Sequence, residues 1–191
     1  MSKVVVFTNL TLDGVMQAPG RPDEDRRGGF EHGGWATPYA AMAQAGNSIS
    51  YTGALLLGRR TYEDFYTVWP NRTDNPFTAV LNNTQKYVAS TTLSEPLSWS
   101  NSTLLKGDAA EAVARLKEEQ GKDLVVLGSG ELVQSLMRRN LVDEYVLLIH
   151  PLVLGSGRRL FADGGAFAAL RLVNTKTTTT GVVIATYAAT R

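Results

Sequence analysis

The chain has 191 residues, of which 43% are hydrophobic and 19% are charged, a composition typical of one soluble globular domain rather than a disordered or fibrous protein. Its 19 basic and 18 acidic residues give a net charge of +1, so no bulk field favours nucleic acid or an anionic membrane as a partner. Cysteine is absent, which excludes disulfides, thiolate metal sites and a cysteine nucleophile.

The first predicted element is a strand over residues 4–10, a β-branched run that leads into Leu12-Asp13-Gly14, a turn signal. Because it begins so close to the N-terminus, we expect it to be a central strand. This short apolar run lacks the h-region of a signal peptide, and no run in the chain reaches the length of a membrane span. We therefore expect a cytoplasmic protein.

Residues 16–34 are rich in glycine, proline and charge, and they predict a long loop. In a compact domain such a loop is either a functional lid or a disordered insert, and the sequence leaves both open. Thr37-Pro38 then predicts a helix, with Thr37 as N-cap and Pro38 at the first helical position, and Gly46 ends it.

A buried strand is predicted over residues 54–57, followed by the turn 58–61 and a short helix that begins near Thr61, where Thr61 and Asp64 resemble a capping box. Two more strands are predicted over residues 77–81 and 86–89, with Ser90 and Thr91 after the second.

A short strand over residues 103–105 precedes a helix capped by Asp108 and Glu111, which Gly121 closes. Residues 123–139 then repeat the pattern of strand, glycine turn and helix. The last predicted pair of strands covers residues 143–150 and 181–188, and residues 173–180 are strand-like in threonine content. Strands that alternate with helices, followed by an all-strand end, predict an α/β fold with a mostly parallel sheet and an antiparallel edge.

Two of these glycine turns are candidates for binding an anionic ligand. Gly58-Arg59-Arg60-Thr61 combines close backbone approach with two guanidinium groups and a hydroxyl near a helix start, which suits the phosphates of a nucleotide, including the extra phosphate of NADP. Gly128-Ser129-Gly130 presents free backbone amides at the start of a helix. The alternative for both is structural: solvated arginines and an ordinary turn.

Asp13 follows the first strand at the same edge of the sheet, where its carboxylate could orient a substrate or relay a proton; the alternative is a residue of an Asp-Gly turn. The two histidines, His32 and His150, form no metal-ligand spacing, so no metal is expected. No G-x-S-x-G sequence supports a hydrolase.

Five segments occur in an order that resembles the riboflavin-biosynthesis reductase (RibD C-terminal) domain family, which shares the dihydrofolate reductase fold. These segments are 11–14, 58–63, 126–130, 141–144 and 151–157. The resemblance covers nearly the whole chain. It implies a mixed sheet of about eight strands flanked by helices, NADPH as the cofactor and frequently a homodimer.

The resemblance also implies a role for each turn. The first turn would meet the adenosine phosphates, the residues after the strand at 86–89 would meet the ribose or 2′-phosphate, and the second glycine turn would meet the pyrophosphate. The cofactor-binding residues so implied are Gly58, Arg59, Arg60, Thr61, Ser90, Thr91, Gly128, Ser129, Gly130, Glu131 and Leu132.

Three departures from the family pattern bear on which substrate we expect. Residues 37–45 contain no carboxylate, which disfavours folate reduction; Leu127 stands where riboflavin-pathway members tend to have Glu; and the zinc signature of the deaminase often fused to that reductase is missing. We therefore expect an NADPH-dependent reductase of a small pyrimidine- or pterin-like heterocycle, with Asp13 as candidate catalytic residue. The alternatives are a nucleotide-binding protein of the same fold without efficient activity, and a domain that acts through protein contacts.

Overall fold

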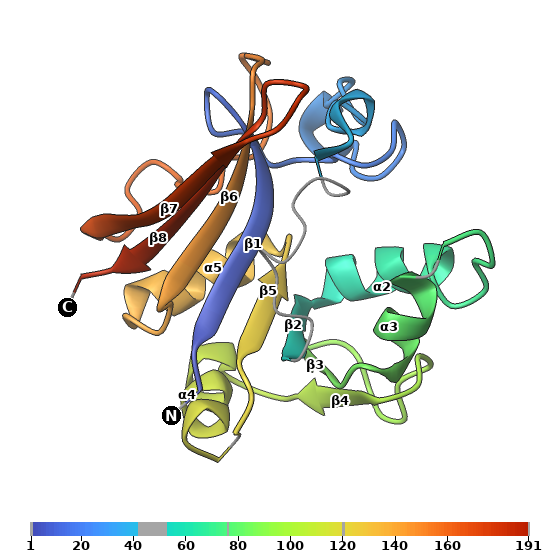
Figure 1. Cartoon of the computed structure of the whole chain (residues 1–191). Helices are drawn as coiled ribbons and strands as arrows, with labels where there is room; N and C mark the ends of the chain where they lie inside the picture. The colour runs from blue at the N-terminus through green and yellow to red at the C-terminus, as the bar shows by residue number, and fades with distance from the viewer. Residues whose placement is uncertain (1, 42–52, 76, 120, 191) are drawn as a thin grey trace.

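One eight-stranded sheet runs through the molecule, in the order β4-β3-β2-β5-β1-β6-β8-β7 (Figure 1). The structure is a computed structural model, and it describes residues 2–41, 53–75, 77–119 and 121–190. The strands are β1 (Val4–Thr11), β2 (Ala54–Gly58), β3 (Lys86–Ala89), β4 (Ser102–Leu105), β5 (Leu124–Leu127), β6 (Glu144–His150), β7 (Leu170–Thr177) and β8 (Val183–Ala189). Neighbours from β4 to β6 are parallel, whereas β8 and β7 are antiparallel. The predicted sheet, with β1 in its interior, is confirmed.

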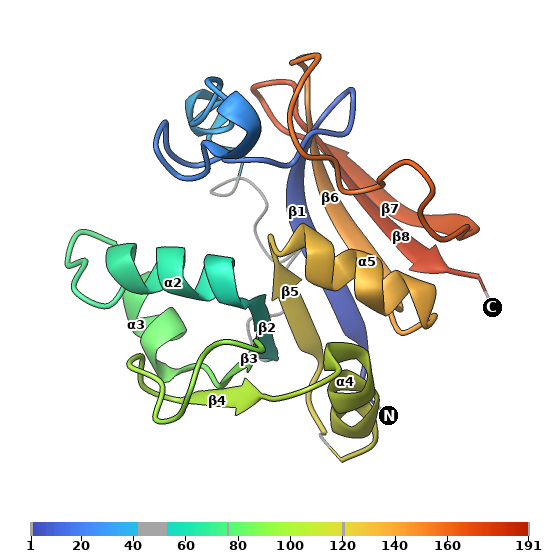
Figure 2. The same ribbon diagram turned by 180° about the vertical axis from the view of Figure 1, so that it is seen from behind.

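The helices divide between the two faces of the sheet. They are α2 (Arg59–Val68), α3 (Phe77–Asn83), α4 (Ala109–Glu119) and α5 (Gly130–Arg138). Leucine and valine side chains of α4 and α5 pack with Val4, Val6 and Leu10 of β1. Phe7 of β1 points to the other face, into a cluster with Tyr62 of α2 and residues of α3. Figures 1 and 2 show α4 and α5 on one side of the sheet.

The alternation along the strands explains this two-sided core. Because successive side chains of a strand point to opposite faces, an apolar run such as that of β1 supplies both clusters at once. The result is a sheet covered on both faces, as is usual for parallel strands. Within the described residues, no helix is long and apolar enough to cross a membrane.

Residues 77–81, predicted as a strand, form a helix, so that prediction is wrong. The side-chain oxygen of Asn75 accepts a hydrogen bond from the Phe77 amide at 2.9 Å and caps α3. Thr78 and Leu81, three residues apart, are the buried residues of this helix. A short apolar run is compatible with either strand or helix, and here the Asn75 cap and the burial of one helical face decide.

Two predicted helix starts are also corrected. Helix α2 begins at Arg59, two residues before the predicted start, and Thr61 and Asp64 bond to other segments instead of forming a capping box. Residues 37–39 form a 3₁₀ turn, in which the Thr37 hydroxyl donates to the Gly20 carbonyl at 2.8 Å rather than capping. The rest of the helix predicted over residues 37–46 lies mostly outside the described residues.

The C-terminal edge contains one more strand than the predicted closing pair. Strands β6 and β8 pair antiparallel, as predicted. Strand β7 covers residues 170–177, so it begins before the strand-like run 173–180 and makes the outer edge, with a register shift between Leu172 and Asn174.

Candidate nucleotide-binding site

Two turns that start helices on opposite faces of the sheet lie side by side. Strand β2 leads into α2 on one face, and its neighbour β5 leads into α5 on the other. The chain therefore leaves the carboxyl ends of these two strands in opposite directions, and a crevice opens between them. Open α/β sheets bind their ligands at such a point.

The hydroxyl of Ser129 joins the two turns. Its Oγ accepts a hydrogen bond from the Gly58 amide and lies within hydrogen-bond distance of Thr61 Oγ1, both at 2.9 Å. Gly128 and Ser129 have φ of 56° and 55°, in the left-handed region that a serine rarely adopts. Such backbone strain is concentrated at functional sites, and here it turns the chain sharply from β5 into α5.

The first turn of α5 presents unpaired amides. The Val133 amide donates to the Ser129 carbonyl at 3.0 Å, but the amides of Gly130, Glu131 and Leu132 find no acceptor in the part of the chain that the structure describes. Met16 packs closely over Gly130, where an added Cβ would lie 2.7 Å from the Met16 sulfur. These amides and the positive end of the helix suit a phosphate group.

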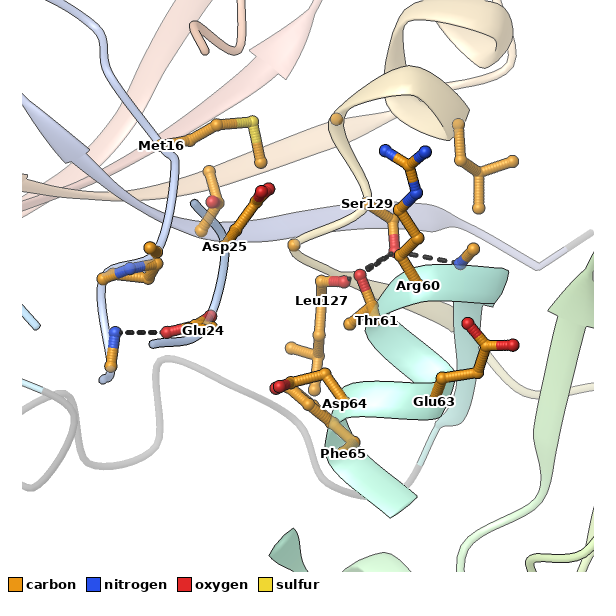
Figure 3. A pocket seen from close by; sticks show the side chains of 18 of the residues that line it. Met16, Glu24, Asp25, Arg60, Thr61, Glu63, Asp64, Phe65, Leu127 and Ser129 are labelled. Atoms are coloured by element: carbon orange, nitrogen blue, oxygen red, sulfur yellow. Dashed lines mark hydrogen bonds between the residues drawn. The ribbon is translucent and has the colours of Figure 1, made fainter. Parts of the chain in front are cut away.

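The two arginines at the start of α2 differ in their surroundings. Arg59 Nη1 binds Glu63 Oε2 at 3.0 Å, one helical turn later. Arg60 is exposed and has no acceptor or carboxylate partner among the described residues. Figure 3 shows the Arg60 side chain beside Ser129. Of these two arginines, Arg60 is therefore the one whose guanidinium is available to an anionic ligand.

The residues after β3 complete the row of turns. The Ser90 hydroxyl oxygen accepts hydrogen bonds from the amides of Thr92 and Leu93, at 3.1 and 3.0 Å. Thr91 is exposed. Because β3 is adjacent to β2, these hydroxyls lie next to the Arg59–Arg60 turn at the same edge of the sheet.

One cavity of about 1620 Å³ connects these turns. All eleven predicted cofactor-binding residues line it, from Gly58 through Ser90 to Leu132. Small-molecule pockets typically enclose about 300–1,000 Å³, so this cavity has room for a dinucleotide together with a second small ligand.

The loop 16–34 forms the opposite wall of the cavity. The sequence alone did not assign this position to the loop. Figure 3 shows Met16, Glu24 and Asp25 across from Thr61 and Asp64 of α2. The loop packs around a small core of its own, composed of Val15, Ala18, Phe30 and Trp35. An ion pair between Arg21 and Asp64 ties it to α2. The loop is therefore a packed wall of the cavity rather than a disordered insert, and its role as a functional lid stays a prediction.

Glu24 places a carboxyl group in this wall. Its Oε2 accepts hydrogen bonds from the amides of Gly20 and Arg21, at 2.7 and 3.1 Å. Burial raises the pKa of Glu24 above its usual value, and the two amides act against this shift. The loop thus brings a carboxyl group to the cavity, although residues 37–45 contain none.

Asp13, the predicted catalytic residue, does not line the cavity. Its carboxylate accepts hydrogen bonds from the Thr11 hydroxyl at 2.6 Å and from the amides of Leu154 and Gly155 at 3.2 and 2.8 Å. The Thr11 hydrogen bond is the largest contribution that lowers the pKa of Asp13 to about 2. These contacts support the turn role that the sequence left open, and the catalytic role of Asp13 stays a prediction.

No group of three or more His, Asp or Glu side chains in the described ranges could hold a metal ion.

His150 is fully buried, and its Nε2 atom contacts the side chain of Asn9, which lines the cavity. Sequence patterns gave no signal for this pair, because its members are 141 residues apart.

Solved structures with low sequence identity share this fold. A putative riboflavin biosynthesis protein from Shewanella sp. PV-4 aligns with a TM-score of 0.68 at 21% identity, over 99% of both chains. A pyrimidine reductase-like protein from Corynebacterium diphtheriae aligns with a TM-score of 0.67 at 12% identity, over 100% of this chain and 92% of that one. RibD from Acinetobacter baumannii gives 0.67 at 14% identity, and the alignment covers 100% of this chain and 59% of that chain.

Two Bacillus subtilis proteins are similar in sequence. YyaP is 33% identical over 144 residues, which are 73% of this chain and 75% of that protein, and YwjB is 28% identical over 181 residues, 91% of each. The sequence model of the RibD C-terminal domain family matches residues 2–184 of this chain. The chain therefore belongs to the RibD C-terminal domain family.

Proposed function

We propose that the protein is an NADPH-dependent reductase of a small pyrimidine- or pterin-like heterocycle. The observation that carries the proposal is the convergence of three strand ends on one cavity. Beside it lie the first amides of α5 and the Arg60 guanidinium, none of which has a partner among the described residues. Membership of the RibD C-terminal domain family and the similarity to a pyrimidine reductase-like protein support the reductase class.

Each turn would hold one part of the cofactor. The amides of residues 130–132 would bind the pyrophosphate, and Arg60 would bind an adenosine phosphate. The hydroxyls of Ser90 and Thr91 would contact the ribose or its 2′-phosphate. When bound, the nicotinamide would supply the hydride, and the chain's own residues would orient both reactants and exclude water. The position of the loop 16–34 in the cavity wall supports a role for that loop in excluding water.

The test is a titration with NADPH and with NADH, followed by nicotinamide fluorescence. Arg60→Ala removes charge-assisted hydrogen bonds, so we expect NADPH affinity to fall by about tenfold or more. Arg115→Ala is the matched control, because Arg115 is exposed on α4 and does not line the cavity, and it should change affinity by less than about threefold. Failure of the wild-type protein to bind either nucleotide would refute the proposal.

Activity assays separate the reductase from its alternative. Hydride transfer from NADPH to a pterin, pyrimidine or flavin acceptor supports the reductase. Cofactor affinity without transfer to any of these acceptors supports a nucleotide-binding protein of the same fold, the alternative that the sequence left open.

We also propose that the protein forms a homodimer through β7. This strand is one of the two edges of the sheet, and an uncovered edge strand is a surface for pairing with another chain. Leu172 and Val173 on it are each 50% exposed, and Phe167 just before it is 91% exposed. A second copy covering this edge would bury these apolar side chains.

A further inference from the structure

A buried histidine contacts a polar side chain of the cavity. Asn9 of β1 lines the cavity, and its Oδ1 lies 3.0 Å from Nε2 of His150 at the end of the neighbouring strand β6. His150 is completely buried. The rings of Trp35 and Tyr39 pack edge-on against the imidazole, with centroid distances of 5.1 and 5.2 Å.

The surroundings of His150 select one tautomer. Burial lowers the pKa of His150 to about 4, so the imidazole is neutral at physiological pH and carries one N–H. Nδ1 is buried and has no partner in the described part of the chain. A proton on Nδ1 would be a buried donor without an acceptor, whereas a proton on Nε2 donates to the oxygen of Asn9. The Nε2–H tautomer is therefore favoured.

This tautomer fixes the carboxamide of Asn9. If the carboxamide were flipped, its Nδ2–H group would face the Nε2–H group of His150, and two donors would meet. The orientation with Oδ1 toward His150 is therefore the favoured one. Nδ2 has no acceptor among the described residues and is not among the buried unpaired atoms, so it is open to the cavity. A cavity wall of mostly apolar strand residues thus carries one oriented, unused NH₂ donor.

The strand order locates this donor relative to the proposed cofactor. Ser90, Gly58, Gly128 and Asn9 belong to β3, β2, β5 and β1 or follow them directly, and these four strands are consecutive neighbours. Adjacent strands are about 4.8 Å apart, so the row from β3 to β1 spans roughly 14 Å. If the adenosine of a dinucleotide lies at Ser90 and its pyrophosphate at Gly128, its nicotinamide therefore lies toward Asn9.

We propose that the Asn9 NH₂ group is a specificity-determining donor for an amide-type carbonyl oxygen at the reacting end of the cavity, and that His150 is its positioning residue. The inference rests on the proposed function and names the chemistry of the ligand there. An amide-type carbonyl can belong to the lactam of a heterocyclic substrate or to the carboxamide of the nicotinamide.

Asn9→Asp tests the donor. Aspartate keeps the shape and the oxygen that His150 contacts, but it replaces NH₂ with an oxygen that repels a carbonyl. We would measure the affinity of NADPH, of 2′,5′-ADP, which lacks the nicotinamide, and of lumazine, a heterocycle with lactam carbonyls, presented to the NADP⁺-saturated protein. We expect a loss of about tenfold for lumazine or for NADPH, with 2′,5′-ADP unchanged.

The probes distinguish the sources of the carbonyl. Loss for lumazine alone assigns the donor to the substrate, and loss for NADPH but not 2′,5′-ADP assigns it to the nicotinamide. A variant that binds all three probes as the wild type does overturns the inference and leaves the proposed function intact. A wild-type protein that binds no nicotinamide nucleotide overturns the proposed function, and if it also fails to bind lumazine, the inference falls with it.

Two variants test the positioning role of His150. The amide of His150→Gln can still donate to Asn9, so it should retain the probe affinity that His150→Phe loses, although both remove the imidazole. The ¹⁵N–¹H signal of the Asn9 side chain should shift on probe binding in the wild type and in His150→Gln. Equal affinity loss in both variants, with no shift of that signal in the wild type, would show that His150 acts only through packing.

Discussion

Removal of the titrating group at His150 should flatten the pH dependence of stability over one defined range. In the folded protein, burial lowers the pKa of His150 to about 4, whereas an exposed histidine titrates near 6.5. Between these values the unfolded chain binds a proton that the folded chain does not. The free energy of unfolding therefore falls as the pH is lowered from about 6.5 to about 4, and this contribution is complete below the folded value.

The size of the effect follows from the same two values. At about 1.4 kcal/mol per pH unit, the difference between 6.5 and about 4 corresponds to about 3.5 kcal/mol in full, of which about 3 kcal/mol is reached at pH 4, where the folded histidine is half protonated. Other titratable groups affect the unfolding free energy over different pH ranges or in the opposite direction. The lowered pKa of Asp13 changes the unfolding free energy between its ordinary value of 3.8 and about 2, below the His150 range. The raised pKa of Glu24 changes the unfolding free energy with pH in the opposite direction.

The assay is urea unfolding of the wild type and His150→Gln at a series of pH values from 7.5 to 4, followed by tryptophan fluorescence, since Trp35 packs on the imidazole. The difference in unfolding free energy between the two proteins cancels the contributions of Asp13 and Glu24. We expect this difference to be constant above about pH 7 and to shift by about 3 kcal/mol, in favour of the variant, as the pH approaches 4. A flat difference across the whole range would refute the reasoning.

Two further predictions concern Asp13 and β7. Asp13→Asn replaces one acceptor of the turn with a donor that faces the Leu154 and Gly155 amides. The free energy of unfolding should therefore fall by about 1 kcal/mol, while NADPH affinity stays within about twofold. Loss of turnover without loss of stability would instead support the predicted catalytic role of Asp13. Leu172→Lys with Val173→Lys should convert the dimer to a monomer in sedimentation velocity, whereas Val153→Lys, an exposed residue outside β7, should not. A monomeric wild type would contradict the proposed dimer.

The local units of the site could be predicted from the sequence because each is built from neighbouring residues. A four-residue apolar run that stops at Gly128 and continues at helical spacing allows little besides strand, turn and helix. The same holds for the run that ends at Gly58. Parallel strands place their carboxyl ends at one edge, so the turns after β2, β3 and β5 were expected to share a ligand, and they line one cavity.

Contacts between distant segments could not be predicted in this way. The hydrogen bond from the Gly58 amide to Ser129 Oγ requires β5 to lie beside β2, and nothing in either segment specifies that neighbour. The pair of Asn9 and His150 depends likewise on the pairing of β1 with β6. In residues 77–81 the local signal itself is ambiguous, because the apolar run suits both a strand and a helix until the Asn75 cap decides.

The strand order also explains why one loop can serve the whole site. Strand β5 returns to the sheet between β2 and β1, so the crevice between the diverging helices and the end of β1 are neighbours. The loop that follows β1 thus starts beside the α5 amides, where Met16 covers Gly130, and reaches α2 through the ion pair of Arg21 and Asp64. A chain with β1 at the edge of the sheet could not place this wall opposite both helix starts. The central position of β1 therefore determines which segment can line the cavity opposite both helix starts.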